Sequence, residues 1–176
     1  MARVLGASRG LWITLGLVSG LFLLSRTGTG SQIAMAAGDF LLNTTRGIRN
    51  NNPGNIVRTN DVWQGESPDQ SGDDRFVVFT APEWGIRAMV RILRRYYSSG
   101  LTTVSQIISQ WAPSTENDTQ AYIDAVANQM GVSPDGVLSF DNALPLLVSA
   151  IITHENGQQP YDISIIDKGI ALEASS

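Results

Sequence analysis

A glutamate near the end of this chain has the setting of an acid catalyst. Glu155 completes an apolar stripe that begins at Val148 and follows the i, i+3, i+4 and i+7 spacing of a helix. A carboxyl group on an apolar face loses water, so its pKa is expected to rise, and the negative end of the helix dipole acts in the same direction. Such a group can protonate a glycosidic oxygen near neutral pH. The alternative is a glutamate that has simply reached solvent at the end of its helix.

The residue types that are absent or rare narrow the chemistry further. Among its 176 residues the chain has no cysteine and one histidine, His154. These counts exclude disulfides, thiolate nucleophiles and iron–sulfur clusters. They also argue against a metal-dependent or thiol-dependent peptidase or amidase, because such enzymes use histidine or cysteine side chains. We expect no metal and no cofactor. Adjacent helix residues point about 100° apart, so His154 is expected to be a neighbour of Glu155 that hydrogen-bonds locally.

A hairpin and four helices are expected to position these residues. The β-type runs 55–59 and 75–80 flank a turn-rich acidic segment, which predicts a hairpin with a long loop. Apolar periodicity and capping residues predict helices over about 82–100, 102–113, 118–130 and 141–156. The corner RGIRNNNPGN at 46–55 is either a structural turn or a cleft wall whose amides bind sugar N-acetyl groups. The sequence thus predicts a mostly helical α+β domain in which the β-hairpin precedes four helices.

Charge is unevenly distributed along the chain. Residues 1–38 contain three arginines and no acidic residue, which leaves 9 basic and 16 acidic residues, a net charge of −7, for residues 39–176. Nucleic-acid binding depends on clustered Lys and Arg side chains that neutralise phosphates. We therefore expect an acidic working domain that does not bind nucleic acid.

The basic N-terminal part also contains an uncharged apolar segment. Residues 10–25 lie between Arg9 and Arg26 and would form a helix of about 24 Å, which could cross a membrane if both arginines snorkelled. The alternatives are a signal peptide cleaved before Ala37 and a buried core helix. The expected organisation is a membrane anchor or signal-like helix over 1–26, a flexible linker over 27–38 and a domain over 39–176.

Several segments together resemble a group of bacteriophage virion proteins that look like peptidoglycan-degrading enzymes. The segments are RGIRNNNPGNI, VWQG, RFVVFTAPEWGIRAM, IISQWAPSTENDTQAYI and AIITHENGQQPY, and they extend from residue 46 to about residue 170. The last is similar to the helix end that carries the catalytic glutamate of lytic transglycosylases. NNPGNI with FVVFTAPEWGIRAM is similar to a segment of bacterial glucosaminidases. The resemblance implies a lysozyme-like core whose glutamate helix comes last, as a circular permutation would produce.

The same resemblance implies a function. The chain would be a virion-associated enzyme that cleaves the MurNAc-GlcNAc glycan of peptidoglycan during cell-wall penetration, with Glu155 as general acid/base. Its implied substrate-binding residues are Asn51, Asn52, Asn55, Trp63 and Tyr161. Expected partners are peptidoglycan strands, a membrane through residues 10–25 and other virion proteins. The protein would sit in the virion membrane and act in the host periplasm or cell wall, with export by a signal peptide as the alternative.

The number of carboxylates decides which glycan-cleaving reaction is expected. A lytic transglycosylase needs one acid/base, because the muramyl 6-hydroxyl of the substrate completes the reaction. A retaining lysozyme needs a second carboxylate about 5–5.5 Å away, and an inverting one needs it about 6.5–9.5 Å away. The loop candidates are Asp61, Glu66, Asp69, Asp73 and Asp74, and nothing in the sequence selects one. The single-glutamate version is therefore favoured. A non-catalytic membrane-anchored virion structural protein, or a cell-wall binding module, is the alternative function.

Overall fold

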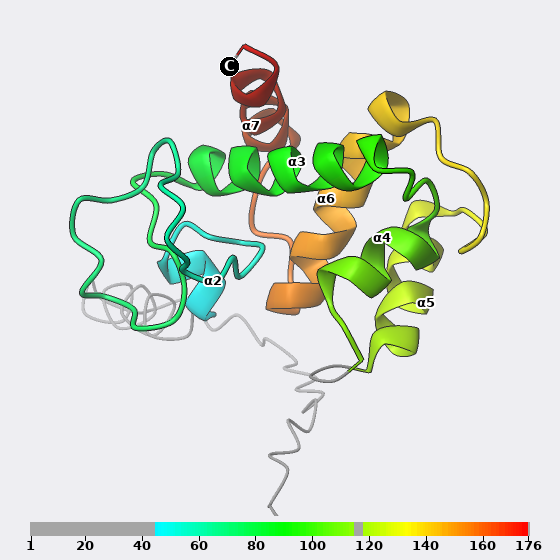
Figure 1. The fold of residues 1–176 in the computed structure, drawn as a ribbon, viewed down its shortest axis with the longest axis horizontal. Coiled ribbons are helices and arrows are strands. Elements are labelled where there is room, and N and C mark those ends of the chain that lie inside the picture. The colour runs from blue at the N-terminus through cyan, green and yellow to red at the C-terminus, as the bar shows by residue number, and fades with distance from the viewer. Residues whose placement is uncertain (1–44, 115–117, 176) are drawn as a thin grey trace, which may run out of the picture. The chain divides into compact units, whose positions relative to one another are not determined.

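The computed structural model describes residues 45–114 and 118–175, and these residues contain six helices (Figure 1). They are α2 (Arg46–Arg49), α3 (Pro82–Ser98), α4 (Val104–Trp111), α5 (Thr119–Met130), α6 (Phe140–Asn156) and α7 (Ile163–Ala174). The prediction of a mostly helical domain is confirmed. The expected helix over 1–26 and linker over 27–38 lie outside the described residues. Within the described ranges, no helix has the length and apolar character needed to cross a membrane.

Capping groups define both ends of α5, the start of α4 and the end of α6. Thr103 and Gln106 form a capping box at the start of α4, in which each side chain bonds the backbone N–H of the other. The Asp118 side chain accepts from the N–H of Ala121 at the start of α5. Helices α5 and α6 both end at a left-handed glycine, Gly131 with φ 67° and Gly157 with φ 66°. Glu155 therefore lies in the last turn of α6.

Helix α6 runs through the middle of the described fold, with α4 and α5 on one side, the 46–80 region on the other and α3 across it (Figure 1). Its inward face is completely buried, and Leu147, Val148 and Ile151 each have 0% exposure. The inward faces of α3 and α4 complete the same core with Leu93 and Ile108. Burying large apolar side chains stabilises the fold by about 1.5–3 kcal/mol each. This packing fixes the position of the end of α6.

The prediction that residues 55–80 form a hairpin of two regular strands is wrong. Instead of strands, the segment 55–80 contains two isolated antiparallel bridges, Val57 with Phe76 and Glu66 with Phe79. Side-chain amides explain the difference, because they take backbone groups that a ladder would use. Asn52 Oδ1 accepts from the N–H of Ile56 and Asn52 Nδ2 donates to the carbonyl of Val77, at 2.9 Å in each case, so these two backbone groups do not pair with each other. The two β-type runs therefore lie side by side without a regular ladder.

Helix α7 is a fifth helix after the bridged segments, where four were predicted. Asp162 caps its start by accepting from the N–H of Ser164 at 2.9 Å. The helix packs mainly against α3, and Gly169 allows the close approach, because a Cβ there would lie 2.5 Å from Ile86. A capping Asp followed by apolar residues was the available sequence signal.

Helix α3 also lies very close to the corner at Gly85, and this contact predicts how a larger residue there would change stability. A Cβ at Gly85 would lie 2.1 Å from the backbone oxygen of Asn51. Alanine normally stabilises a helix by about 1 kcal/mol relative to glycine, but overpacking against backbone costs about 1–3 kcal/mol. We expect Gly85→Ala to lower the free energy of unfolding by about 2 kcal/mol in urea titrations. Gly72→Ala is the control, since no atom lies within 4 Å of that Cβ position, and equal stability of both variants would contradict the prediction.

Candidate functional site

The carboxylate of Glu155 is held by three side chains from three other parts of the chain. Asn55 Nδ2 donates to Oε2 at 2.9 Å. Trp111 Nε1 and the Tyr122 hydroxyl both donate to Oε1, at 3.1 and 2.8 Å. Each carboxylate oxygen has two lone pairs, so these bonds use both positions of Oε1 and one position of Oε2. The geometry leaves Oε2 as the oxygen that can exchange a proton with a ligand.

Glu155 lines an open cleft of about 310 Å³, which is at the small end of the range for ligand sites. The other lining residues are Gly54, Asn55, Ile56, Val57, Arg75, Phe76, Ile92, Tyr96, Trp111, Ala112 and Pro113. They come from the bridged segments, from α3 and from the end of α4. Glu155 is therefore beside the bridged segments. Three aromatic rings and one guanidinium group share the cleft with its carboxylate.

Glu155 also lines a second hollow. It measures about 320 Å³ and is lined by Asp118, Ala121, Tyr122, His154 and Glu155. The rings of Tyr122 and His154 stack with their centroids 3.6 Å apart. Desolvation lowers the pKa of His154, although the charge of Glu155 opposes this. Burial, followed by the charge of Glu155, raises the pKa of Tyr122. Near neutral pH, Tyr122 thus remains a hydroxyl donor and His154 a neutral imidazole.

Asp73 has a structural position instead of a catalytic one. Its carboxylate accepts from Arg46 Nε at 2.5 Å, from Asn50 Nδ2 at 2.6 Å and from the N–H of Phe76 at 2.8 Å. The Arg46 guanidinium is the main reason that the pKa of Asp73 lies well below its usual range. Asp73 is only 6% exposed. It therefore ties the loop to α2.

The other four loop carboxylates also lie outside the cleft. Glu66 accepts from the backbone N–H of Trp63 at 3.1 Å, and Asp74 pairs with Arg46 at 2.8 Å. Asp61 and Asp69 bond to neighbouring loop residues. Among the described residues, Glu155 is the single carboxylate that lines its cleft, and Asp118, absent from the sequence candidates, lines the second hollow. No group of three His, Asp or Glu residues suited to a metal occurs within 45–114 and 118–175.

The three asparagines of the corner that were predicted to bind substrate have different surroundings. Asn52 is 0% exposed, and both hydrogens of its amide are donated to backbone carbonyls. Asn51 donates to the carbonyl of Phe79 at 3.0 Å. Asn51 and Asn55 adopt left-handed backbone, with φ 52° and 49°, which asparagine tolerates better than most residues. Asn51 and Asn52 therefore stabilise the local fold, whereas Asn55 contacts the carboxylate of Glu155.

The two predicted aromatic contacts lie away from the cleft. Trp63 packs beside the arginines of α3, where it lines two other hollows. Tyr161 is half-buried against the core, and burial raises its pKa to about 12. Trp111 and Tyr122 are the aromatic residues that contact Glu155. Both residues belong to apolar helical stripes, and the sequence contains one indication of a role in the site. Each side chain carries a polar group, an indole N–H or a hydroxyl, that needs a hydrogen-bond partner when it is buried.

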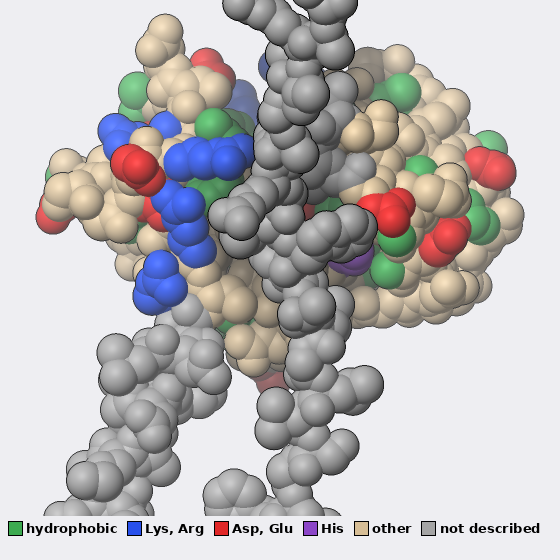
Figure 2. All heavy atoms as spheres, turned by 90° about the horizontal axis from the view of Figure 1, so that it is seen from below, with side chains coloured by type: hydrophobic (Ala, Val, Ile, Leu, Met, Phe, Trp, Pro, Cys, Tyr) green, Lys and Arg blue, Asp and Glu red, His purple; other side chains and the backbone are tan. Residues whose placement is uncertain are grey.

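On the surface seen from below, basic side chains gather on the left, whereas acidic side chains occur on both sides (Figure 2).

Fold and site together define a small helical protein with a cleft organised around one glutamate. Its sequence is 44% identical over 128 residues to protein P5 of Pseudoalteromonas phage PM2, which covers 70% of this chain and 79% of that protein. The chain therefore belongs to the family of this bacteriophage protein. None of the protein-family models matches the chain.

Proposed function

We propose that this chain is a virion-associated phage enzyme that cleaves the glycan strands of peptidoglycan, with Glu155 as the general acid/base. One observation carries the proposal. Glu155 lies at an open cleft, and three donors orient its carboxylate while leaving one position of Oε2 free. Membership of a bacteriophage protein family supports the virion setting.

The proposed reaction is that of a lytic transglycosylase. The carboxyl group of Glu155 protonates the glycosidic oxygen as the bond to the muramyl C1 breaks. The carboxylate then accepts the proton of the substrate 6-hydroxyl, whose oxygen bonds to C1. No water is consumed, and the proton balance closes on one residue. The absence of a second carboxylate among the described residues that line this cleft favours this version over the two-carboxylate lysozyme reactions.

The cleft walls are suited to a sugar chain. The rings of Phe76, Tyr96 and Trp111 offer flat apolar surfaces, and Arg75 supplies hydrogen-bond donors at the same cleft. The proposal includes a lysozyme-like core with permuted element order. The bridged segments precede α6 in the chain, yet the hydrogen bond from Asn55 to Glu155 joins them directly to the end of that helix.

The test is digestion of purified peptidoglycan by the full chain, with mass spectrometry of the soluble products. Transglycosylation gives muropeptides that are lighter by one water than the products of hydrolysis. Products with free reducing ends would replace the transglycosylase version by a lysozyme version. Failure to release any glycan fragment would overturn the enzymatic proposal.

A non-catalytic structural protein is the second candidate, and one observation favours it. The bonds to Glu155 join α6 to α4, to α5 and to the 50–55 corner, so the same contacts could serve stability alone. In that case the wild type releases no muropeptides, and substituting Glu155 changes only the free energy of unfolding.

The Tyr122 hydroxyl is proposed as a positioning group for the catalytic carboxylate. Tyr122→Phe removes the 2.8 Å bond to Oε1 while keeping the ring. Losing one such bond, about 1–1.5 kcal/mol, is expected to lower kcat about tenfold with KM nearly unchanged. Tyr161→Phe is the matched control, because that buried hydroxyl has no partner among the described residues and lies outside the cleft. Equal kcat values for the two variants would exclude this role.

A further inference from the structure

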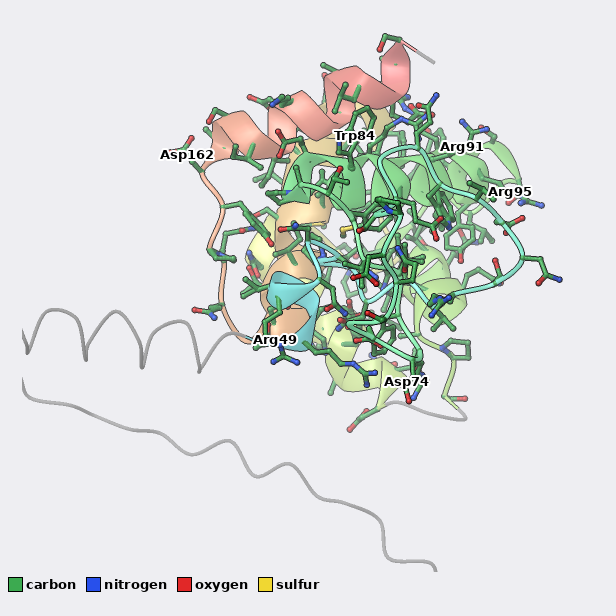
Figure 3. The ribbon with its side chains drawn as sticks, turned by 90° about the vertical axis from the view of Figure 1, so that its left-hand side faces the viewer. Arg49, Asp74, Trp84, Arg91, Arg95 and Asp162 are labelled. Atoms are coloured by element: carbon green, nitrogen blue, oxygen red, sulfur yellow. The ribbon has the colours of Figure 1, made fainter. Side chains whose placement is uncertain are left out.

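A hollow lined by arginines on α3 has no part in the proposed reaction. Arg87, Arg91 and Arg95 follow one another at four-residue intervals, which places them on one face of the helix. Figure 3 shows Arg91 and Arg95 next to each other on α3. The hollow measures about 490 Å³, and its other lining residues are Asp61, Val62, Trp63 and Gln64.

Three guanidinium groups and one carboxylate, that of Asp61, line the hollow. Like charges at four-residue intervals destabilise a helix. Arg87 is only 3% exposed; burial followed by the charge of Arg91 lowers its pKa, and the charge of Glu173 opposes this. The neighbouring Arg94 is different, since it pairs with Asp141 at 2.9 Å and with Glu173 at 2.8 Å. Within the described ranges, Arg91 and Arg95 make no such ion pair.

Trp63, which lines the same hollow, carries an indole N–H that can donate a hydrogen bond. Its indole Nε1 is buried and has no hydrogen-bond acceptor among the described residues. Trp63 also lines an adjacent hollow of about 410 Å³ that shares Arg91 and Arg95. A buried donor without an acceptor is unfavourable, so an acceptor that reaches this N–H is stabilised by it as well as by the charges.

We propose that this hollow binds a phosphate group attached to a small hydroxylated unit such as glycerol. Guanidinium groups match phosphate oxygens in geometry and charge. A phosphate has more acceptor oxygens and more charge than a carboxylate, so it fits the two exposed guanidinium groups of Arg91 and Arg95 better. Asp61 repels a second anionic group, but it can accept a hydrogen bond from a hydroxyl of the ligand. The volume suits a phosphate with its polyol, either free or as a lipid headgroup.

The test is isothermal titration of the full chain with glycerol 3-phosphate. The Arg91→Gln/Arg95→Gln double variant removes two exposed charges without touching the core, and it is expected to bind at least tenfold more weakly. Arg94→Gln is the control, and its affinity is expected to stay within threefold because that guanidinium is already paired. Equal affinity of the wild type and the double variant, or no binding by the wild type, would overturn the proposal.

Vesicles distinguish the two sources of the phosphate. Flotation with phosphatidylglycerol vesicles, compared with phosphatidylcholine vesicles, is expected to show binding that the double variant loses if the ligand is a lipid headgroup. Binding of glycerol 3-phosphate without this headgroup effect identifies a free phosphate compound. Tighter binding of a DNA oligonucleotide, lost in the same variant, would replace the proposal by a nucleic-acid site. Peptidoglycan cleavage is expected to be unchanged in the double variant, so the two proposals fail separately.

Discussion

Glu155→Gln is expected to reduce the release of muropeptides by about 100-fold to 10,000-fold, the contribution typical of general acid/base catalysis. The substitution keeps the volume of the side chain and removes the proton that the reaction transfers. If the amide oxygen takes the place of Oε1, it can still accept from Trp111 and Tyr122. The amide nitrogen then faces Asn55 Nδ2, which is also a donor. The rate of fragment release from purified peptidoglycan measures the effect.

Glu66→Gln is the matched control for this experiment. Glu66 accepts from the backbone N–H of Trp63 at 3.1 Å and lies outside the cleft, so its substitution is expected to change the rate less than twofold. Thermal unfolding of both variants separates lost chemistry from lost structure. Release by Glu155→Gln at the wild-type rate would show that this carboxylate is not the catalyst.

Asp73→Asn is expected to lower the free energy of unfolding by about 2–4 kcal/mol at neutral pH, because it removes a buried carboxylate from its ion pair and leaves several donors unmatched. The carboxylate accepts from Arg46, Asn50 and backbone N–H groups while being only 6% exposed. An asparagine places an NH₂ group where two acceptor oxygens are required. Urea titration measures the loss.

The pH dependence of stability gives a second measure of Asp73. Its pKa is lower in the folded protein than the usual value of about 3.9, mainly because of Arg46. The stabilisation is therefore complete above about pH 4 and is lost as the pH falls through the folded-state pKa. The wild type is expected to lose stability in acid, and Asp73→Asn to lose less. Urea titrations at neutral and acidic pH compare the two slopes.

Asp74→Asn is the control for both experiments on Asp73. The Asp74 side chain is 96% exposed and pairs with the same Arg46. Exposed ion pairs contribute about 0–1 kcal/mol, so this change is expected to cost less than 1 kcal/mol. If Asp74→Asn were as destabilising as Asp73→Asn, the buried network would not be the cause.

The sequence alone was sufficient for those features that depend on neighbouring residues. Helices α3 to α6 follow from apolar periodicity and from capping groups such as Thr103 and Asp118, which act within a single turn. The same periodicity places Glu155 in the last turn of α6. Helix α7 carries comparable local signals, which begin at its capping residue Asp162.

The tertiary structure decided which residues meet at that glutamate. Asn55, Trp111 and Tyr122 lie 100, 44 and 33 residues away from Glu155 along the chain, and packing of α4, α5 and the 50–55 corner on α6 brings them together. Periodicity assigns Trp111 and Tyr122 to the core side of their helices, but it cannot show which polar group the indole N–H or hydroxyl will meet.

The tertiary structure also separated residues that look equivalent in sequence. Asp73 and Asp74 are adjacent acids of one loop, yet one carboxylate is buried against Arg46 and the other is 96% exposed. Their burial depends on where the loop is held against α2. Asn52 likewise bonds to the N–H of Ile56 and the carbonyl of Val77, which a hairpin ladder would have paired with each other. Local pattern determines which elements form, whereas the choice of partner depends on long-range packing, which brings together polar groups that are distant in the chain.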